Sequence, residues 1–248
     1  MLSATEYLAA RTQPQGLHIR LNFVQFTLAD MTDELTDALR NDRNVVGVAT
    51  TDNTHAMPEL RRLFVELINR ELTLPIVLMR GYGTPPAVAV RAVDVPLYAA
   101  TDLGGLLIDG FGDGILLQAI HADQVKQLNS LAFGILQAAR TRITKTEYIS
   151  CPSCGRTLFD LQETTAHIRQ RTDHLKGVKI GIMGCIVNGP GEMADADYGY
   201  VGIGRDKIAL YRGQQVMKKS VPAINAVDAL IELIREDGRW LEPTEAAF

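Results

Sequence analysis

The three cysteines of this 248-residue chain lie close together, between residues 151 and 185. Cys151 and Cys154 form a Cys-x-x-Cys pair. Cys185 follows a short apolar, β-branched run at 178–183, which predicts a buried strand. A turn rich in glycine and proline comes next, and Glu192 follows it. Three thiols and a nearby carboxylate predict one metal site at the end of that strand.

Cysteine spacing alone leaves the identity of this site open. A lone Cys-x-x-Cys pair can be half of a zinc site, a redox dithiol or part of an iron–sulfur site. Structural zinc prefers four Cys or His ligands, but the sequence has no second Cys-x-x-Cys and no histidine near Cys185. A thioredoxin-like dithiol would leave Cys185 unexplained. Three thiolates and a harder, more easily displaced carboxylate favour an iron–sulfur cluster with one distinctive iron.

Composition narrows the class of protein further. Hydrophobic residues make up 46% of the chain and the net charge is −4, so we expect neither nucleic acid nor a membrane surface as a partner. No apolar run reaches the ~18 residues of a membrane span, and the N-terminus does not resemble a secretory signal. Three cysteines in so long a chain argue against a disulfide framework and favour a reducing, cytoplasmic compartment.

The first 145 residues alternate between strand-like and helix-like segments. The pattern predicts strands at 18–28, 45–49, 75–79, 97–100 and 114–120, helices at 32–40, 58–72 and 121–142, and a helical turn at 102–109. This alternation is typical of an α/β layer with parallel strands. A whole (β/α)₈ barrel needs ~200 residues or more, so we expect a partial barrel or a small sheet.

The composition changes at residues 141–147, which predicts one domain over 1–145 and a smaller one over 146–248. In the second domain a helix is expected from Asp160 to Leu175, because Asp160 and Glu163 form a helix-start signature. The remaining expectations are strands at 178–183, 200–204, 208–211 and 215–221, and a last helix capped by Asn225 with Val227, Leu230, Ile231 and Ile234 inward.

Three segments of this second region resemble 4-hydroxy-3-methylbut-2-enyl diphosphate synthases, which act in the methylerythritol phosphate route to isoprenoids. They are Cys-Pro-Ser-Cys-Gly-Arg-Thr at 151–157, Gly-Cys-Ile-Val-Asn-Gly-Pro-Gly-Glu at 184–192 and Met-Ala-Asp-Ala-Asp-Tyr-Gly-Tyr-Val-Gly at 193–202. Residues 102–114 resemble the inserted middle domain of the three-domain form found in plants and some bacteria. The resemblance implies a barrel-like structural domain over 1–145 and an α/β iron–sulfur domain of the sulfite/nitrite reductase type over 146–248.

The resemblance also implies the contents of the site. A 4Fe-4S cluster would be bound by Cys151, Cys154, Cys185 and Glu192, and Asn188 would face the substrate. The implied reaction is the reductive dehydroxylation of 2-C-methyl-D-erythritol 2,4-cyclodiphosphate to 4-hydroxy-3-methylbut-2-enyl diphosphate, with ferredoxin or flavodoxin as electron donor. Glu192 would give way to a substrate oxygen on the unique iron and then carry a proton.

One segment departs from the family pattern. The family's catalytic barrel ends in Gly-Asp-Thr-Ile-Arg-x-Ser, whereas residues 112–118 read Gly-Asp-Gly-Ile-Leu-Leu-Gln. Leu116 and Gln118 therefore replace the phosphate-binding arginine and serine. We expect residues 1–145 to be scaffold, and the chain to be a C-terminal fragment that lacks the substrate-binding N-terminal barrel and is inactive alone. A zinc-stabilised binding module and a cluster-free structural fragment are the alternatives.

Overall fold

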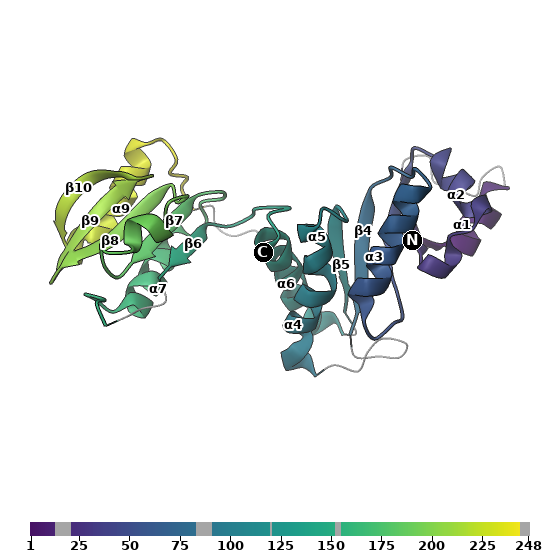
Figure 1. The fold of residues 1–248 in the computed structure, drawn as a ribbon, viewed down its shortest axis with the longest axis horizontal. Coiled ribbons are helices and arrows are strands. Elements are labelled where there is room, and N and C mark those ends of the chain that lie inside the picture. Colours follow the sequence, from purple (N-terminus) through teal and green to yellow (C-terminus); the bar gives the residue numbers. More distant parts are fainter. Residues whose placement is uncertain (13–20, 83–90, 120, 152–154, 244–248) are drawn as a thin grey trace. The chain divides into compact units, whose positions relative to one another are not determined.

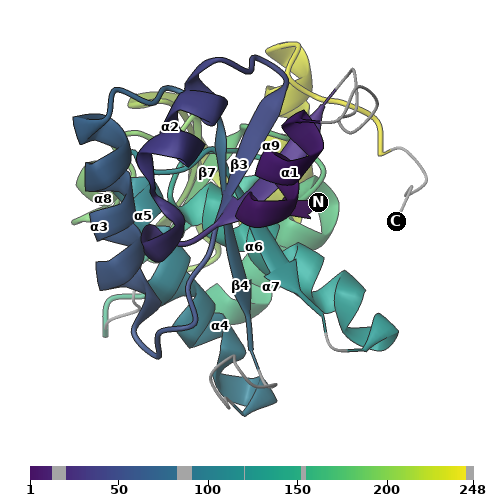
Figure 2. The same ribbon diagram turned by 90° about the vertical axis from the view of Figure 1, so that its right-hand side faces the viewer.

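The computed structural model describes residues 1–12, 21–82, 91–119, 121–151 and 155–243. The chain divides into two compact units, Met1–Arg142 and Ile143–Phe248, and each contains one five-stranded sheet (Figures 1 and 2). The α/β class predicted from the sequence is confirmed. Among the described residues, no helix combines the length and the apolarity that crossing a bilayer requires.

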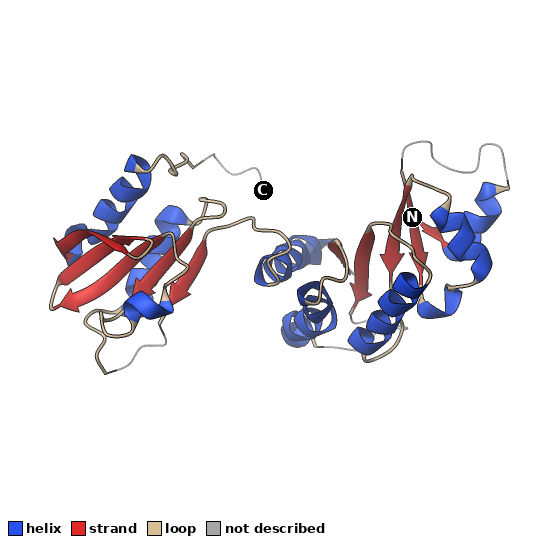
Figure 3. Cartoon of the chain, turned by 45° about the horizontal axis from the view of Figure 1, so that its top comes forward, coloured by secondary structure: helices blue, strands red, loops and turns tan. Residues whose placement is uncertain are grey.

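The first unit alternates strands and helices along the chain (Figure 3). Its strands are β1 (Leu2–Ser3), β2 (Asn22–Phe26), β3 (Val45–Ala49), β4 (Ile76–Gly81) and β5 (Gly114–Gln118). Its helices are α1 (Ala4–Arg11), α2 (Asp33–Arg40), α3 (Ala56–Asn69), α4 (Val95–Ala99), α5 (Gly105–Ile108) and α6 (Val125–Ala138). All strand pairs are parallel and the spatial order is β1-β2-β3-β4-β5, as in the chain.

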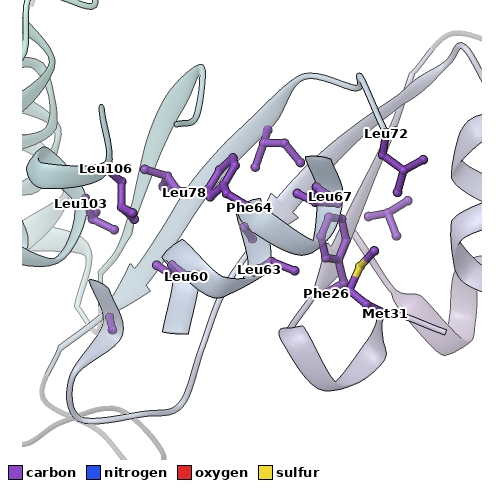
Figure 4. Close-up of a cluster of buried hydrophobic side chains, with 14 of the residues drawn as sticks. Phe26, Met31, Leu60, Leu63, Phe64, Leu67, Leu72, Leu78, Leu103 and Leu106 are labelled. Carbon is purple, nitrogen blue, oxygen red and sulfur yellow. The ribbon is translucent and has the colours of Figure 1, made fainter. Parts of the chain in front are cut away.

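This consecutive order explains where the core of the first unit lies. Right-handed crossovers that all step in one direction place their helices on the same face of the sheet. On that face Phe26 and Leu78 pack with Leu60, Leu63 and Phe64 of α3 (Figure 4). The Phe64 ring stacks on Phe111 with a centroid distance of 5.1 Å. One continuous core therefore joins the helices to the sheet.

The opposite face of the sheet is less covered. Phe23, Val46, Val77 and Leu116 share this face by strand register. Phe23 is 41% exposed, whereas Val48 and Met79 on the same face are buried. The described strands do not close into a barrel, and their order is that of an open arc of parallel βα units. The expectation of a small parallel sheet is therefore met, and the described strands form no closed barrel.

One predicted strand is wrong. Residues 97–100 are helical, because α4 begins with Pro96 in its first turn and continues through a π-helical stretch, Ala100–Gly104, into α5. Proline suits the first turn of a helix, since its missing N–H is unpaired there in any case. The π-helical stretch contains Asp102, which is only 6% exposed. The predicted helical turn at 102–109 is confirmed.

Asp102 is buried because it faces Arg80, which lies near the end of β4 and is 2% exposed. Arg80 Nε lies 3.3 Å from Asp102 Oδ2, and the Tyr82 hydroxyl donates to that same oxygen at 3.0 Å. The other guanidinium nitrogens of Arg80 donate to the carbonyls of Thr51 and Asn53, both at 2.7 Å. Burial, and then the Asp102 charge, raise the pKa of Tyr82, so its phenol stays protonated.

We predict that Asp102→Ala destabilises the first unit by about 3 kcal/mol or more, because it leaves the Arg80 charge buried without its counter-ion. Denaturant unfolding measures this change. Asp37→Ala is the matched control, since it removes an exposed ion pair with Arg40 and such pairs contribute about 1 kcal/mol or less. Equal effects of the two substitutions would contradict the assignment of the buried pair.

The second unit contains a mixed sheet. Its elements are β6 (Glu147–Ser150), α7 (Leu161–Thr172), β7 (Lys179–Met183), α8 (Gly189–Glu192), β8 (Tyr198–Gly204), β9 (Lys207–Arg212), β10 (Gln215–Pro222) and α9 (Ala223–Glu236). The strand order is β10-β9-β8-β7-β6. Strands β6, β7 and β8 are parallel, whereas β9 and β10 return antiparallel.

Alternate residues of these strands build two separate cores. Ile180 and Ile182 of β7 belong to one cluster, together with Ile168 of α7 and Leu230 of α9. Met183 belongs to a second cluster, on the other face of the sheet, which contains Met193, Ala196, Val201, Ala209 and Tyr211. The helices therefore cover one face, and the segment after β7 covers the other.

Three details of the second unit differ from expectation. Strand β6 was not predicted, because Glu147–Ser150 is short and half exposed and gains its stability from pairing with β7. Asp160 caps α7 as predicted, accepting from the Glu163 N–H at 2.9 Å, but this helix ends at Thr172. Asn225 lies inside α9 and does not cap it, because β10 runs through Pro222 directly into the helix.

Alkaline pH is expected to destabilise the second unit through Tyr200, which is 2% exposed. Burial raises the pKa of Tyr200 to about 12, whereas an unfolded tyrosine titrates near pH ~10. Between these values the unfolded chain binds fewer protons, so stability falls as pH rises, by on the order of 2 kcal/mol from this residue. Denaturant unfolding from pH 9 to 12 should show a shallower decline for Tyr200→Phe. Parallel curves would contradict this account.

Candidate metal centre

Two of the predicted ligands lie at the same edge of the second sheet. Cys151 directly follows β6, and Cys185 follows β7 with Gly184 between. Strands β6 and β7 are parallel neighbours, and Ser150 pairs with Ile182. Because the carboxyl ends of parallel strands meet at one edge, the sheet brings together two cysteines that are far apart in sequence.

Backbone hydrogen bonds fix Cys151 against the end of β7. The Cys151 N–H donates to the Ile182 carbonyl at 3.3 Å, and the Gly184 N–H donates to Cys151 Sγ at the same distance. Cys151 Sγ therefore lies beside the residue that precedes Cys185. Both cysteines are free thiols and are half buried. This arrangement gives two soft ligands in one place, each partly open to an incoming group.

The chain that follows Cys151 returns to the same point. The Leu158 N–H donates to the Gly184 carbonyl at 3.2 Å. A Cβ atom at Gly184 would lie 2.7 Å from Thr157 Oγ1, and one at Gly202 would lie 2.6 Å from the Gly184 carbonyl oxygen. Residues 151 and 158 are thus both anchored on Gly184. Cys154 lies between them but outside the described residues.

Asn188 caps the short helix α8 and Glu192 is its last residue, so the glycine- and proline-rich segment expected to be only a turn is helical. The Asn188 carbonyl accepts from the N–H groups of Gly191 and Glu192 at 3.1 and 3.0 Å. Pro190 lies in the first turn of the helix, where the missing N–H of a proline costs little. Both Asn188 and Glu192 are exposed. Their side chains are therefore accessible to a ligand or substrate.

The turn that carries Glu192 is anchored by the next residue, Met193, which is 1% exposed. Its side chain occupies a slot between Gly181 of β7 and Gly199 of β8, which are directly paired in the sheet. A Cβ atom on Gly181 would lie 2.6 Å from Met193 Cβ, and one on Gly199 would lie 2.6 Å from its Sδ and Cε atoms. Because neither Gly181 nor Gly199 has a side chain, the side chain of Met193 fits against the two paired strands.

The structure gathers the predicted ligands only in part. Cys151 and Cys185 meet at one sheet edge, and Cys154 is outside the described residues. Within the described ranges, no three or more His, Cys, Asp or Glu side chains group closely enough to hold a metal ion. Glu192 is therefore not gathered with the two described cysteines.

Sequence reasoning missed the supporting residues of the site. Gly181 and Gly199 each stand between large apolar residues, as Ile-Gly-Ile and Tyr-Gly-Tyr. Small residues at paired positions of adjacent strands signal that another segment packs closely there. The pairing of the two strands, which the sequence does not state, is needed to turn this signal into a slot for Met193.

We predict that Met193→Ala lowers the stability of the second unit by about 2–5 kcal/mol, because it empties a closed slot in the core. Met217→Ala is the matched control, since Met217 lies on β10 and is 38% exposed. Denaturant midpoints of the two variants give the comparison. A Met193→Ala variant as stable as Met217→Ala would show that Met193 is not the anchor of this turn.

The fold and site define an α/β protein with a thiol-rich site at the edge of a mixed sheet, and comparison with known proteins agrees. Residues 147–236 match the family model described as GcpE protein C-terminal domain. The chain is 49% identical over 224 residues, or 89% of its length, to the 4-hydroxy-3-methylbut-2-en-1-yl diphosphate synthase (flavodoxin) of Parabacteroides distasonis. It is 49% identical over 197 residues, or 79% of its length, to the chloroplastic (ferredoxin) enzyme of Arabidopsis thaliana.

Residues 147–236 therefore belong to the GcpE C-terminal domain family, and the chain is a partial-length relative of 4-hydroxy-3-methylbut-2-en-1-yl diphosphate synthases, which confirms the resemblance inferred from its motifs. A third relative, the chloroplastic (ferredoxin) enzyme of Oryza sativa subsp. japonica, is 47% identical over 242 residues, or 95% of this chain. The chain spans 35%, 26% and 31% of the lengths of these three relatives. It thus corresponds to about a third or less of each of them.

Proposed function

We propose that this chain supplies the cluster-binding part of a 4-hydroxy-3-methylbut-2-enyl diphosphate synthase. In the complete protein the reaction is the two-electron reductive dehydroxylation of 2-C-methyl-D-erythritol 2,4-cyclodiphosphate. One observation carries the proposal: the Gly184 N–H donates to Cys151 Sγ at 3.3 Å, which places that sulfur beside the residue that precedes Cys185. This contact lies inside the region that matches the family model.

The residues present fit a 4Fe-4S cluster. The donor set of Cys151, Cys154 and Cys185 is soft, as iron–sulfur chemistry requires. Cys154 is three residues from Cys151, and a chain of that length spans at most about 11 Å. A backbone N–H already donates to one sulfur, which is a common way to stabilise a cluster thiolate. When bound, such a cluster supplies the electrons for the reduction.

Glu192 is the proposed fourth ligand and the one that substrate displaces. A carboxylate is a harder ligand than a thiolate and leaves iron more readily. Glu192 is exposed on its short helix, whereas Cys151 is held by the backbone bonds described above. Because Glu192 does not lie with Cys151 and Cys185, the proposal requires the turn that carries Glu192 to move toward these two thiols. Asn188, exposed at the other end of α8, is proposed to face the substrate.

The two units have different proposed roles. We propose that the second unit is of the sulfite/nitrite reductase type, supported by its mixed sheet and by the thiols at the sheet edge. The first unit is proposed to be part of a barrel-like structural domain, supported by its consecutive parallel strands. Leu116 and Gln118 offer no charge to a phosphate, and the buried Arg80 is already bonded to Thr51 and Asn53.

The partners follow from the same proposal. Ferredoxin or flavodoxin is the proposed electron donor, because the relatives' names carry these two words. The cyclodiphosphate has two phosphates, and binding that charge calls for several positioned Arg or Lys side chains. We propose that an N-terminal barrel domain outside this chain provides them, and that the protein acts in the cytoplasm without nucleic acid or membrane partners.

Anaerobic reconstitution with iron and sulfide tests the proposal. We expect the 248-residue chain to bind about four iron and four sulfide ions, the content of the cluster. Cys151→Ser and Cys185→Ser should each lose most of this iron, whereas Ser150→Ala, a neighbouring exposed position, should retain it. Zinc bound at one ion per chain, without sulfide, would instead support a zinc-stabilised module. Retention of neither metal would support a structural fragment.

The reconstituted chain also separates cluster binding from turnover. With a strong reductant it should produce no 4-hydroxy-3-methylbut-2-enyl diphosphate alone, and it should produce the compound once the separate N-terminal barrel domain of a relative is added. The barrel is needed because catalysis requires the substrate to be positioned and water to be excluded. Product from the chain alone would mean that residues 1–145 contain a substrate site.

A further inference from the structure

The backbone of Gly184 is held from several sides at the proposed cluster site. Its N–H donates to Cys151 Sγ at 3.3 Å, and its carbonyl accepts from the Leu158 N–H at 3.2 Å. Gly184 is buried. Its Cα packs against the side chain of Thr157, and Gly202 of β8 packs against its carbonyl. The backbone of this one residue therefore connects β7, β8 and the segment that follows Cys151.

These contacts leave Gly184 little freedom to turn its N–H away from the sulfur. A Cβ atom at position 184 would lie 2.7 Å from Thr157 Oγ1 and 2.8 Å from Thr157 Cγ2. A Cβ atom at Gly202 would lie 2.6 Å from the Gly184 carbonyl oxygen. Both glycines are needed for the observed packing: Thr157 packs against the Cα of Gly184 and Gly202 packs against its carbonyl, so the residue that carries the N–H is held on both sides.

A fixed N–H donor at a cluster ligand has an electrostatic consequence. Reduction adds negative charge to the cluster and its thiolates, and a hydrogen bond to sulfur stabilises the more negative state. The donor therefore favours reduction. Because the donor belongs to the backbone, the direction of the N–H bond depends on the packing around Gly184 and not on the rotamer of a side chain.

We propose that Gly184 is a positioning residue of the iron–sulfur site: its backbone N–H holds the Cys151 sulfur and raises the reduction potential of the bound cluster. Thr157 and Gly202 keep the backbone of Gly184 in place. This inference rests on the proposed function, because it requires the cluster. It adds a role for the glycine that precedes the third cysteine, a role distinct from metal ligation.

A purely structural role is the competing explanation. A buried N–H needs a partner, so the bond to sulfur could serve folding alone. That explanation predicts that variants at Gly184 change stability without changing the reduction potential. The two explanations therefore differ in a measurement that stability data do not provide.

The test compares Gly184→Ala with Gly191→Ala in the full chain. At Gly184 the added methyl group must displace Thr157 or the peptide, whereas at Gly191 it meets nothing within 4 Å. Spectroelectrochemical titration of the reconstituted chains should shift the ratio of oxidised to reduced cluster about tenfold toward oxidised for Gly184→Ala, which is a potential lower by about 59 mV for one electron. Gly191→Ala should stay within twofold of the parent chain.

A second substitution, at Thr157, should reverse the effect of Gly184→Ala on the reduction potential. Thr157→Gly removes every Thr157 atom that the new methyl group would meet, so Gly184→Ala combined with Thr157→Gly should recover most of the potential. Hydrogen exchange at amide 184 in the cluster-free chain gives an independent readout. We expect protection in the parent chain and in the double variant, and faster exchange in Gly184→Ala.

Three results would overturn the inference. The first is an unchanged potential in Gly184→Ala although exchange shows that the hydrogen bond is lost, which would leave only a structural role. The second is an amide at 184 that exchanges in the parent chain as fast as an exposed amide. The third is a parent chain that takes up no cluster, which would refute the proposed function and this role with it, whereas the first two leave the proposed function intact.

Discussion

The parallel pairing of β6 with β7 is the interaction on which the candidate site depends. It aligns Ser150 with Ile182, so the residues that follow each strand emerge at the same edge. Cys151 then reaches the Gly184 N–H, and Leu158 returns to the Gly184 carbonyl. If the register moved by one residue, alternate side chains would change face. The bonds to Gly184 would be lost with the shared edge, so the arrangement of the thiols depends on backbone pairing more than on contacts between side chains.

The two units use the ends of parallel strands in different ways. In the first unit, Arg80 near the end of β4 turns its guanidinium into the protein, where Asp102 and the carbonyls of Thr51 and Asn53 bind it. In the second unit, the ends of β6 and β7 present half-buried thiols. Because the guanidinium of Arg80 binds groups inside the first unit, this arginine stabilises that unit but has few donors left to bind a substrate phosphate. This contrast supports assigning chemistry to the second unit and a structural role to the first.

The strongly patterned parts of both units could be predicted from the sequence. Strands β3, β4, β7, β8 and β9 and helices α2, α3 and α9 have clear apolar periods, and these elements were expected close to their observed bounds. Residues 97–100 were assigned to a strand because a short apolar run does not by itself distinguish strand from helix. Strand β6 was missed since its pairing with β7 is a tertiary interaction. For the site, cysteine chemistry pointed to Cys151 and Cys185, which the sheet brings to one edge, but the Gly184 and Met193 contacts follow only from the paired strands.

The two halves of the candidate site also differ in rigidity, and the difference fits the chemistry proposed for it. On the thiol side, backbone hydrogen bonds tie Cys151 to β7 at both its N–H and its sulfur. On the carboxylate side, Glu192 is exposed on a four-residue helix, and the buried side chain of Met193 anchors the turn just beyond it. A ligand that must leave the iron when substrate arrives needs room to move, whereas the thiolates must keep the cluster in place. Fixing Met193 in the Gly181–Gly199 slot limits that movement to the residues before it. Gly181 of β7 and Gly199 of β8 therefore contribute to this limit, since they admit the side chain that anchors the turn on one face of the sheet.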